Sequence, residues 1–158
     1  MKQILSLILS ALIVFSFAGC KKETKVDFYY PRTEIQYGIS DGVIASESRE
    51  LSGENLNLEY LLKLYLEGPV SQGLRNPFPA GTALLSVTLE NKLLTLTLSE
   101  SFGKLENMDY TIACACLATT GFALTDVDTI TILSGSTSIT LTPEIVSLVD
   151  NSGHNLSE

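Results

Sequence analysis

Residues 85–98 read LSVTLENKLLTLTL, two runs of alternating apolar and hydroxyl residues on either side of Asn91-Lys92. This alternation is typical of strands that are buried on one face only. Asparagine tolerates the positive φ of a two-residue hairpin turn; Lys92 is not the glycine that such turns prefer, so a longer loop with a bulge is the alternative. The two-residue turn predicts three apolar pairs: Leu89 with Leu94, Val87 with Leu96, and Leu85 with Leu98. It places hydroxyl groups on the opposite, hydrated face: Ser86, Thr88, Thr95 and Thr97.

A helix is predicted just upstream, over residues 57–66. Its apolar residues have the i, i+3, i+4, i+7 spacing of one buried helical face: Leu58, Leu61, Leu62 and Tyr65. Asn55 or Asn57 is a suitable cap for the first turn. Gly68 followed by Pro69 should end the helix, because glycine adopts the left-handed conformation and proline cannot continue a helix.

The same region resembles a known family. Leu61-Leu62 precedes Gly68-Pro69, and residues 79–87 then read PAGTALLSV. This combination resembles the GerMN domain of sporulation and spore-germination lipoproteins, with a match that extends from Phe28 to Gly135. The resemblance implies a small α+β domain, related to the ring-building modules of secretion and sporulation complexes, that works by protein association and not by catalysis. The implied partners are envelope or sporulation-complex proteins.

Residues 1–19 are interpreted as a lipoprotein signal peptide. An apolar run from Ile4 to Phe17 follows Lys2, and Phe17-Ala18-Gly19-Cys20 resembles a bacterial lipobox, with Phe17 where such signals usually have leucine. The alternative is a transmembrane anchor, which needs about 20 apolar residues and therefore a longer run than this one. We expect cleavage before Cys20 and diacylglycerol on its thiol, which would anchor the chain at the extracytoplasmic face of the cell membrane.

The rest of the chain is expected to form one domain. We predict a lipidated tether over residues 20–26, the domain over 27–150 and a disordered polar tail over 151–158. The signal peptide contains one charged residue, Lys2, so nine basic and eighteen acidic residues remain and the net charge is −9. This charge argues against binding to nucleic acid and against electrostatic binding to an anionic membrane surface.

Two strands are predicted near the start of the domain. Phe28-Tyr29-Tyr30 should form a strand that stops at Pro31, because proline has no amide to donate to a ladder. A second strand is expected from Gly42 to Leu51, after the Asp41-Gly42 turn. Three alternating residues between these strands suggest a further short strand: Ile35, Tyr37 and Ile39.

A second hairpin is predicted near the end of the domain, with its turn at Gly135-Ser136. This turn places threonines on one face and pairs apolar residues on the other: Ile132 with Ile139 and Ile130 with Leu141. Pro143 should end the hairpin, and residues 145–149 are expected to dock as a short helix or strand.

Residues 108–120 are predicted to form a second helix, capped by Asn107 or a neighbour. The helix is apolar nearly all round, so it should be buried or covered by a partner. Its two cysteines, Cys114 and Cys116, project about 200° apart at i, i+2 and can neither form a disulfide with each other nor chelate a metal together. We interpret them as buried, unreactive thiols.

The loop over residues 67–82 carries three prolines and three glycines, which should make it stiff. We interpret it as a shaped connection that pins Phe78 or Leu74 onto the core. The alternative makes the loop part of a partner surface.

No constellation of residues indicates catalysis, a metal or a cofactor. The one histidine, His154, lies in the tail, and Glu100 between Ser99 and Ser101 is interpreted as the end of a strand. Asp126 and Asp128 have a spacing that occurs in calcium sites, but no third acidic ligand follows, so turn and strand-start roles are expected. We therefore expect no enzyme activity.

Together these elements predict an α+β fold, a mostly antiparallel sheet of three to five strands with two helices packed on one face. The predicted function is that of a non-enzymatic lipoprotein domain for protein assembly in the cell envelope. The alternative is a binding lipoprotein for a small molecule or a cell-wall fragment. A deep pocket lined by aromatic residues would favour the alternative, and a flat sheet with an exposed edge would favour assembly.

Overall fold

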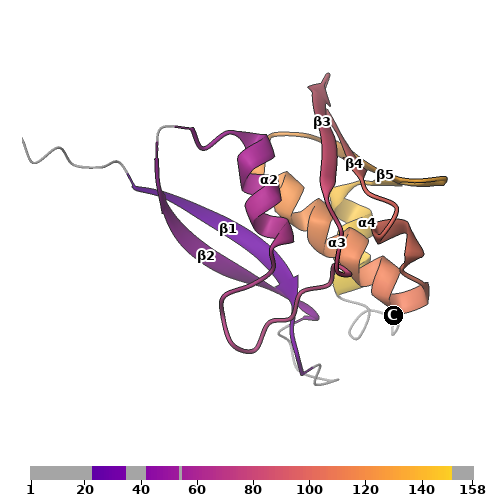
Figure 1. The fold of residues 1–158 in the computed structure, drawn as a ribbon, viewed down its shortest axis with the longest axis horizontal. Coiled ribbons are helices and arrows are strands. Elements are labelled where there is room, and N and C mark those ends of the chain that lie inside the picture. Colours follow the sequence, from indigo (N-terminus) through magenta and orange to yellow (C-terminus); the bar gives the residue numbers. More distant parts are fainter. Residues whose placement is uncertain (1–22, 35–41, 54, 151–158) are drawn as a thin grey trace, which may run out of the picture.

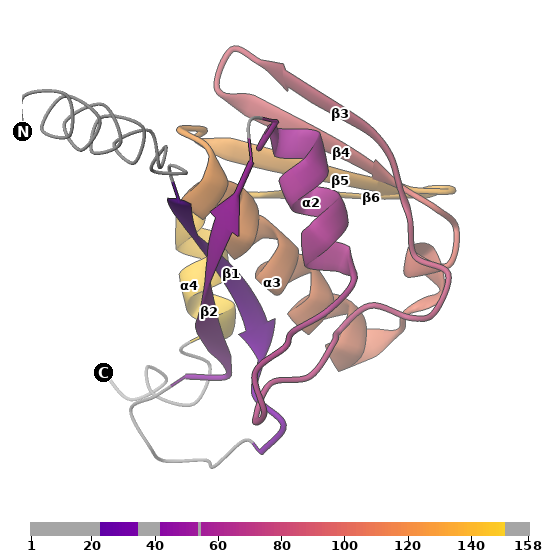
Figure 2. The same cartoon turned by 60° about the vertical axis from the view of Figure 1, so that its left-hand side comes forward.

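The computed structural model describes residues 23–34, 42–53 and 55–150. Its elements are, in order, β1 (Glu23–Pro31), β2 (Ile44–Ser52), α2 (Leu58–Leu66), β3 (Leu84–Glu90), β4 (Leu93–Leu98), the 3-10 helix η2 (Phe102–Lys104), α3 (Asn107–Leu124), β5 (Thr129–Ser134), β6 (Thr137–Leu141) and α4 (Pro143–Asp150). They form three layers, in which the helices lie between the β1–β2 hairpin and a sheet ordered β3-β4-β5-β6 (Figures 1 and 2). The α+β class is confirmed, but the strands form two sheets instead of one.

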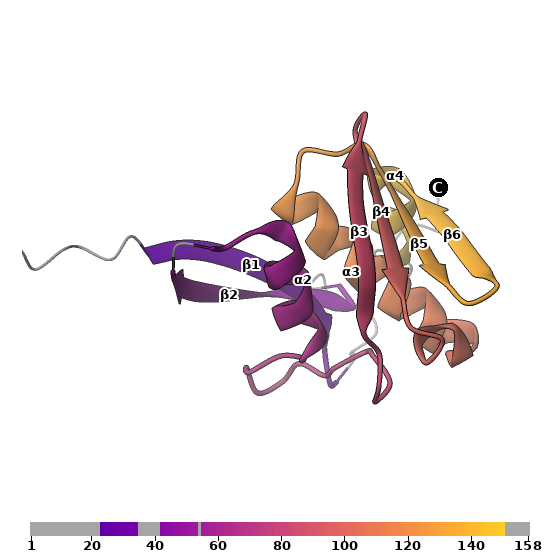
Figure 3. The same cartoon turned by 45° about the horizontal axis from the view of Figure 1, so that its top comes forward.

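The four-stranded sheet contains both predicted hairpins. Asn91 and Lys92 have φ angles of 48° and 64°, as a two-residue turn requires. Four of the predicted pairs are confirmed. In the first hairpin Val87 pairs with Leu96 and Leu89 with Leu94. In the second, Ile130 pairs with Leu141 and Ile132 with Ile139. The two hairpins meet through a parallel pairing of β4 with β5, which the long α3 crossover makes possible (Figure 3).

One predicted pair is wrong. Leu98 lies opposite Leu84 and not Leu85, because the register shifts between Leu84 and Ser86. The start of the hairpin is held by Ser99, whose amide donates to Ala83 O at 2.8 Å and whose hydroxyl accepts from the Ala83 amide at 2.9 Å. With this end and the turn both fixed, the extra residue forms a bulge. Leu85 is consequently left 64% exposed.

α3 is the central element of the core. The helix is buried on nearly all sides from Ile112 to Ala118, as predicted, and both of its cysteines are buried. On one side the hydroxyl of Thr120 accepts a hydrogen bond from the Tyr29 amide of β1 at 2.9 Å. On the other side, a Cβ on Gly121 would lie 2.6 Å from Ile130 Cδ1 of β5, so a larger residue there would force the Ile130 side chain to shift.

The N-cap of α3 is a neighbour of Asn107, as the prediction allowed, but the helix ends later than predicted. The N-cap is Glu106, whose side chain makes no capping hydrogen bond, and Asn107 is already the first helical residue. The helix also continues past Thr120 to Leu124 and includes Gly121, where it packs closely on the sheet. Within the described part of the chain, no helix is long and apolar enough to cross a membrane.

α2 and the loop after it agree with the sequence. Asn57 caps the helix by accepting a hydrogen bond from the Tyr60 amide at 2.9 Å, and the helix ends before Gly68, which has a φ of 99°. Phe78 in the loop is 7% exposed. Its ring lies 5.2 Å from that of Tyr65 and 6.2 Å from that of Phe102, so the loop is pinned onto the core as predicted.

The two ends of the domain test the predicted tether and the predicted segment after the second hairpin. β1 begins at Glu23 and Val26 is buried, so residues 23–26 belong to the fold and not to the expected tether. α4 shows that the segment after the second hairpin is a helix, with Val146 buried. Cys20, the tail over 151–158 and the short strand expected at Ile35, Tyr37 and Ile39 lie outside the described residues.

Candidate protein-association surface

The face of the four-stranded sheet that points away from the helices is covered with hydroxyl groups. One row crosses all four strands through Thr88, Thr95, Thr131 and Thr140. The adjacent row contains Ser86, Thr97, Leu133 and Ser138. These eight side chains are exposed or half-buried, and the hydroxyls of Thr131 and Thr140 are 2.9 Å apart. We call these eight residues the hydroxyl face; all of them except Leu133 carry a hydroxyl group that can form hydrogen bonds.

The sequence predicted which side of each hairpin carries hydroxyl groups, but not that the two hairpins join into one sheet. A single wide face arises because β4 and β5 pair in parallel with Thr95 opposite Thr131. No local pattern encodes that pairing. The long apolar helix between the hairpins was its one signal, because parallel neighbours need such a crossover.

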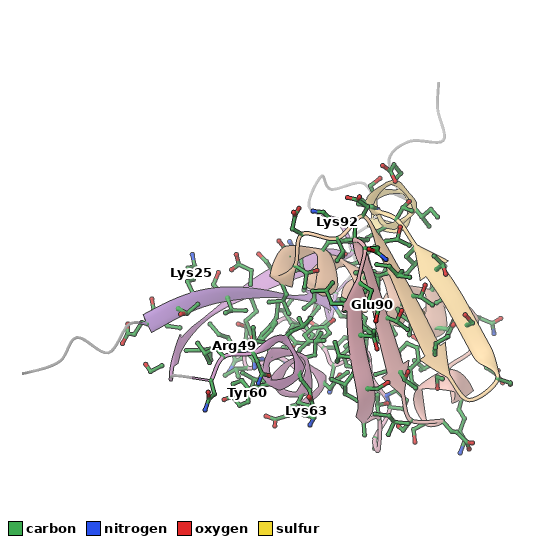
Figure 4. All side chains as sticks on the ribbon, turned by 90° about the horizontal axis from the view of Figure 1, so that it is seen from above. Lys25, Arg49, Tyr60, Lys63, Glu90 and Lys92 are labelled. Carbon is green, nitrogen blue, oxygen red and sulfur yellow. The ribbon has the colours of Figure 1, made fainter. Side chains whose placement is uncertain are left out.

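The β3 border of the sheet also carries exposed apolar groups, and one of them, Leu89, lies on the helix side of the sheet because it pairs with the buried Leu94. Leu85 and Leu89 are 64% and 54% exposed. α2 lies beside β3, and Figure 4 shows Tyr60 and Lys63 on its outward side. A groove of about 340 Å³ runs between the two elements and is lined by Lys63, Leu66, Glu67, Thr82, Ala83 and Leu84.

A buried ion pair, which the sequence analysis did not single out, holds the loop next to this groove. Arg49 Nε donates to Glu47 Oε1 at 2.6 Å, and their side chains are 13% and 4% exposed. Glu47 Oε2 also accepts from the backbone amides of Val70 at 2.9 Å and Ser71 at 2.6 Å. Arg49 donates to the carbonyl of Gly68 at 2.7 Å. The pair therefore fixes the backbone from Gly68 to Ser71, and we call it the Glu47–Arg49 clamp.

Aromatic rings support the clamp. The guanidinium of Arg49 lies 5.0 Å from the ring centroid of Phe28, a cation–π contact. Tyr30 donates its hydroxyl to Tyr65 O at 2.7 Å, and Tyr65 donates to Tyr29 O at 2.8 Å. Burial raises the pKa of both Tyr30 and Tyr65, so these phenols stay protonated and able to donate. The rings pack on one another and do not line either described groove.

The clamp should make folding sensitive to acid. Burial by itself raises the pKa of Glu47, but hydrogen bonds from Ser71 and Arg49 and the charge of Arg49 outweigh it, so the pKa falls below its ordinary 4.5. A carboxyl with a lowered pKa in the folded state contributes stability above its unfolded pKa, and that stability is lost as the pH falls through the folded value.

We therefore expect Glu47→Gln to flatten the pH dependence of unfolding free energy below about pH 4.5. The measurement is urea unfolding followed by circular dichroism between pH 3 and 7, against the unsubstituted chain. Glu59→Gln is the control, because the Glu59 side chain is 60% exposed and pairs with Lys63 on the surface. Equal flattening in both variants would contradict a special role for Glu47.

Two of the residues considered for chemistry, Ser99 and Asp126, have structural partners. The hydroxyl of Ser99 donates to Gly81 O at 2.9 Å and accepts from the Ala83 amide, which places it in the start of the hairpin. Glu100 is exposed beside a second groove of about 290 Å³, which is lined by small and polar side chains. Lys92 pairs with the carboxylate of Asp126 and donates to its carbonyl at 2.8 Å. Burial raises the pKa of Cys114 to about 12, which keeps its thiol protonated.

Comparisons with known proteins agree with the fold. A family model described as Germane, sporulation and spore germination, matches residues 27–140. The tandem GerMN domains of the sporulation protein GerM from Bacillus subtilis superpose with a TM-score of 0.53 at 16% identity, covering 77% of this chain and 43% of that one. A candidate lipoprotein from Clostridium perfringens gives a TM-score of 0.48 at 17% identity, covering 77% and 89%. No curated protein matches. This chain thus spans less than half of the GerM structure.

Proposed function

Because the chain belongs to the Germane family of sporulation and spore germination proteins, we propose that it is a non-enzymatic association module of the cell envelope. Its partners would be envelope or sporulation-complex proteins. A lipid on Cys20 would hold it at the extracytoplasmic face of the cell membrane. The observation that carries the proposal is the hydroxyl face, a broad surface of hydrogen-bonding groups that crosses all four strands.

The chemistry of this surface supports association. A serine or threonine becomes a nucleophile only beside a general base or a metal. In the described part of the chain, no group of three or more potential ligands could hold a metal ion. The hydroxyl face instead offers hydrogen bonds and shape, the features that a protein partner can match.

The alternative, a binding lipoprotein for a small molecule or cell-wall fragment, has less support. Ligand sites are usually apolar pockets of about 300 to 1,000 Å³. The two described grooves, of about 340 and 290 Å³, contain no aromatic side chain. The phenyl and phenol rings of the core are packed against each other instead.

The association is tested by adding charge to the hydroxyl face. We expect the double variant Thr97→Lys, Thr131→Lys to lose partners that co-purify with the unsubstituted chain after crosslinking in native cells. Both side chains are half-buried on central strands, so a lysine can reach solvent without entering the core. Mass spectrometry identifies the partners, and circular dichroism checks the fold.

Thr111→Lys is the matched control, because Thr111 is an exposed threonine on α3 and lies outside the hydroxyl face. Retention of every partner by the folded double variant would overturn the proposal. So would hydrolysis of a cell-wall substrate by the purified chain, if Ser99→Ala or Glu100→Gln abolished that activity.

The anchor has its own test. Cys20→Ala should release the chain from membranes, because Cys20 has the only lipobox flanks in the sequence. The measurement is the fraction of chain that stays in the membrane pellet after a carbonate wash. Cys114→Ala, which removes a buried thiol, should leave attachment unchanged. Full attachment of the Cys20→Ala chain would contradict the lipoprotein assignment.

A further inference from the structure

β3 is a border strand that pairs on one side only, and its protection is confined to its start, where the bulge at Leu85 lies and α2 is close to Leu84. Strand edges are normally blocked by proline, lysine or an inward-pointing charge, because their free backbone groups recruit other strands. From Leu84 to Leu89, β3 contains none of these, and its one charged residue, Glu90, is the last of the strand. Two of its leucines, Leu85 and Leu89, are among the most exposed apolar residues described.

The backbone of β3 is oriented for a further strand. In a two-residue hairpin turn, the carbonyl of Glu90 faces the amide of Leu93 across the turn. Backbone groups in an antiparallel pair alternate between facing the partner strand and facing away. The amides and carbonyls of Val87 and Leu89 therefore point outward, away from β4.

The sequence of β3 is complementary to itself in one antiparallel register. With Val87 opposite a second Val87, each exposed Leu85 lies opposite a Leu89, and each Ser86 lies opposite a Thr88. Glu90 then faces Leu84, so no like charges are opposed. Every pair matches in character except the terminal one, and both exposed leucines become covered.

We propose that β3 pairs antiparallel with β3 of a second copy of this chain, about a two-fold axis at Val87. The contact is isologous, so it closes as a dimer. The hydroxyl faces of the two copies become one continuous face, with the helices of both copies on the opposite side. This inference rests on the proposed function and names a second copy as one association partner. Stable complexes typically bury about 1,200 to 2,000 Å², and this contact consists of one pair of strands, so we expect the dimer to be reversible.

A cysteine at the two-fold axis tests the pairing. Hydrogen-bonded residues opposite each other in antiparallel strands have Cα atoms about 5.5 Å apart, within the range of about 4.4 to 6.8 Å that a disulfide spans. The full chain with Val87→Cys should therefore form a disulfide dimer of twice its mass when intact cells are treated with a mild oxidant. The unsubstituted chain controls for its native cysteines, of which Cys114 and Cys116 are buried.

Two further cysteines test the register. Leu85→Cys and Leu89→Cys, co-expressed with different tags, should crosslink to each other. Neither should crosslink when expressed alone, because each residue then lies four residues out of register with its own copy. Crosslinking of Leu85→Cys with itself would overturn the register.

A charge on the exposed edge of β3 tests whether the dimer forms through that edge. Leu89→Lys should remove most of the Val87→Cys dimer, whereas Met108→Lys, at a residue 66% exposed on α3, should leave it unchanged. Absence of the Val87→Cys dimer, or a product of any mass other than twice that of the chain, would overturn self-pairing. The envelope proteins captured by the unsubstituted chain are scored separately. Absence of the dimer would therefore leave the proposed function unaffected, and absence of those partners would leave the dimer proposal unaffected.

Discussion

Arg49→Ala is expected to lower the free energy of unfolding by about 3 kcal/mol, at the low end of the range for a broken buried ion pair. The substitution leaves the Glu47 carboxylate, 4% exposed, without its cation. The amides of Val70 and Ser71 still donate to that carboxylate, which keeps the loss near the lower limit. The substitution also removes the donor to Gly68 O and the cation over Phe28. Urea unfolding at pH 7 measures the loss.

Lys63→Ala is the matched control for this prediction. Lys63 and Glu59 form a salt bridge with the same 2.6 Å N···O distance, but their side chains are 56% and 60% exposed. Exposed i, i+4 pairs contribute about 0.3 to 0.5 kcal/mol. If both variants lost the same free energy of unfolding, burial would add nothing to the clamp. Arg49→Lys should lie between them, because an ammonium keeps the charge but cannot donate in the same fork to Glu47 and Gly68.

The Glu47–Arg49 clamp was not predicted from the sequence, because its residues have the pattern of solvent-exposed residues. Residues 46–50 read SESRE, a polar run in a strand whose position in the fold is not encoded locally. Strand pairing reverses that reading, because Glu47 lies opposite Phe28 and Arg49 opposite Val26, both buried. An acid and a base two residues apart in one strand necessarily share a face. That spacing was the available signal, and the burial of β1 was needed to interpret it.

Local patterns gave the hairpins, because turn chemistry and alternation lie within a few residues of each other. Asn91-Lys92 set one register and Gly135-Ser136 the other, and both were confirmed. The bulge at Leu85 was missed because it depends on how Ser99 holds Ala83, 16 residues away. The separation of the β1–β2 hairpin from the main sheet depends on α3 packing between them. Neither contact has a counterpart in sequence spacing.

The hydroxyl face was also predictable in part, because alternation along a strand is a local pattern. Ser86, Thr88, Thr95 and Thr97 were assigned to a hydrated face from alternation alone, and the structure leaves them exposed or half-buried. The exposure of Leu85 and Leu89 was not predicted, because alternation says which side of a sheet a residue occupies but not whether a helix reaches far enough to cover it. A border strand is therefore where such assignments fail first.

Leu96→Ala should cost about 2 to 5 kcal/mol of unfolding free energy, through lost burial and the cavity left behind. Leu96 is fully buried on a central strand, between Val87 of β3 and Ile132 of β5, on the face that α3 covers. Neighbours on both sides limit how far the site can collapse, which favours the upper half of that range. The denaturant midpoint should fall while the dependence on denaturant stays unchanged.

Thr97→Ala is the control that makes this measurement a test of register. Thr97 is the next residue along β4, but its side chain lies on the hydroxyl face and is only half-buried. Surface substitutions usually change stability by less than about 0.5 kcal/mol. Because side chains alternate along a strand, a slip of one residue would exchange the two faces and with them the two effects. Equal midpoint losses for Leu96→Ala and Thr97→Ala would therefore contradict both the buried face of the sheet and the hydroxyl face on which the association proposal depends.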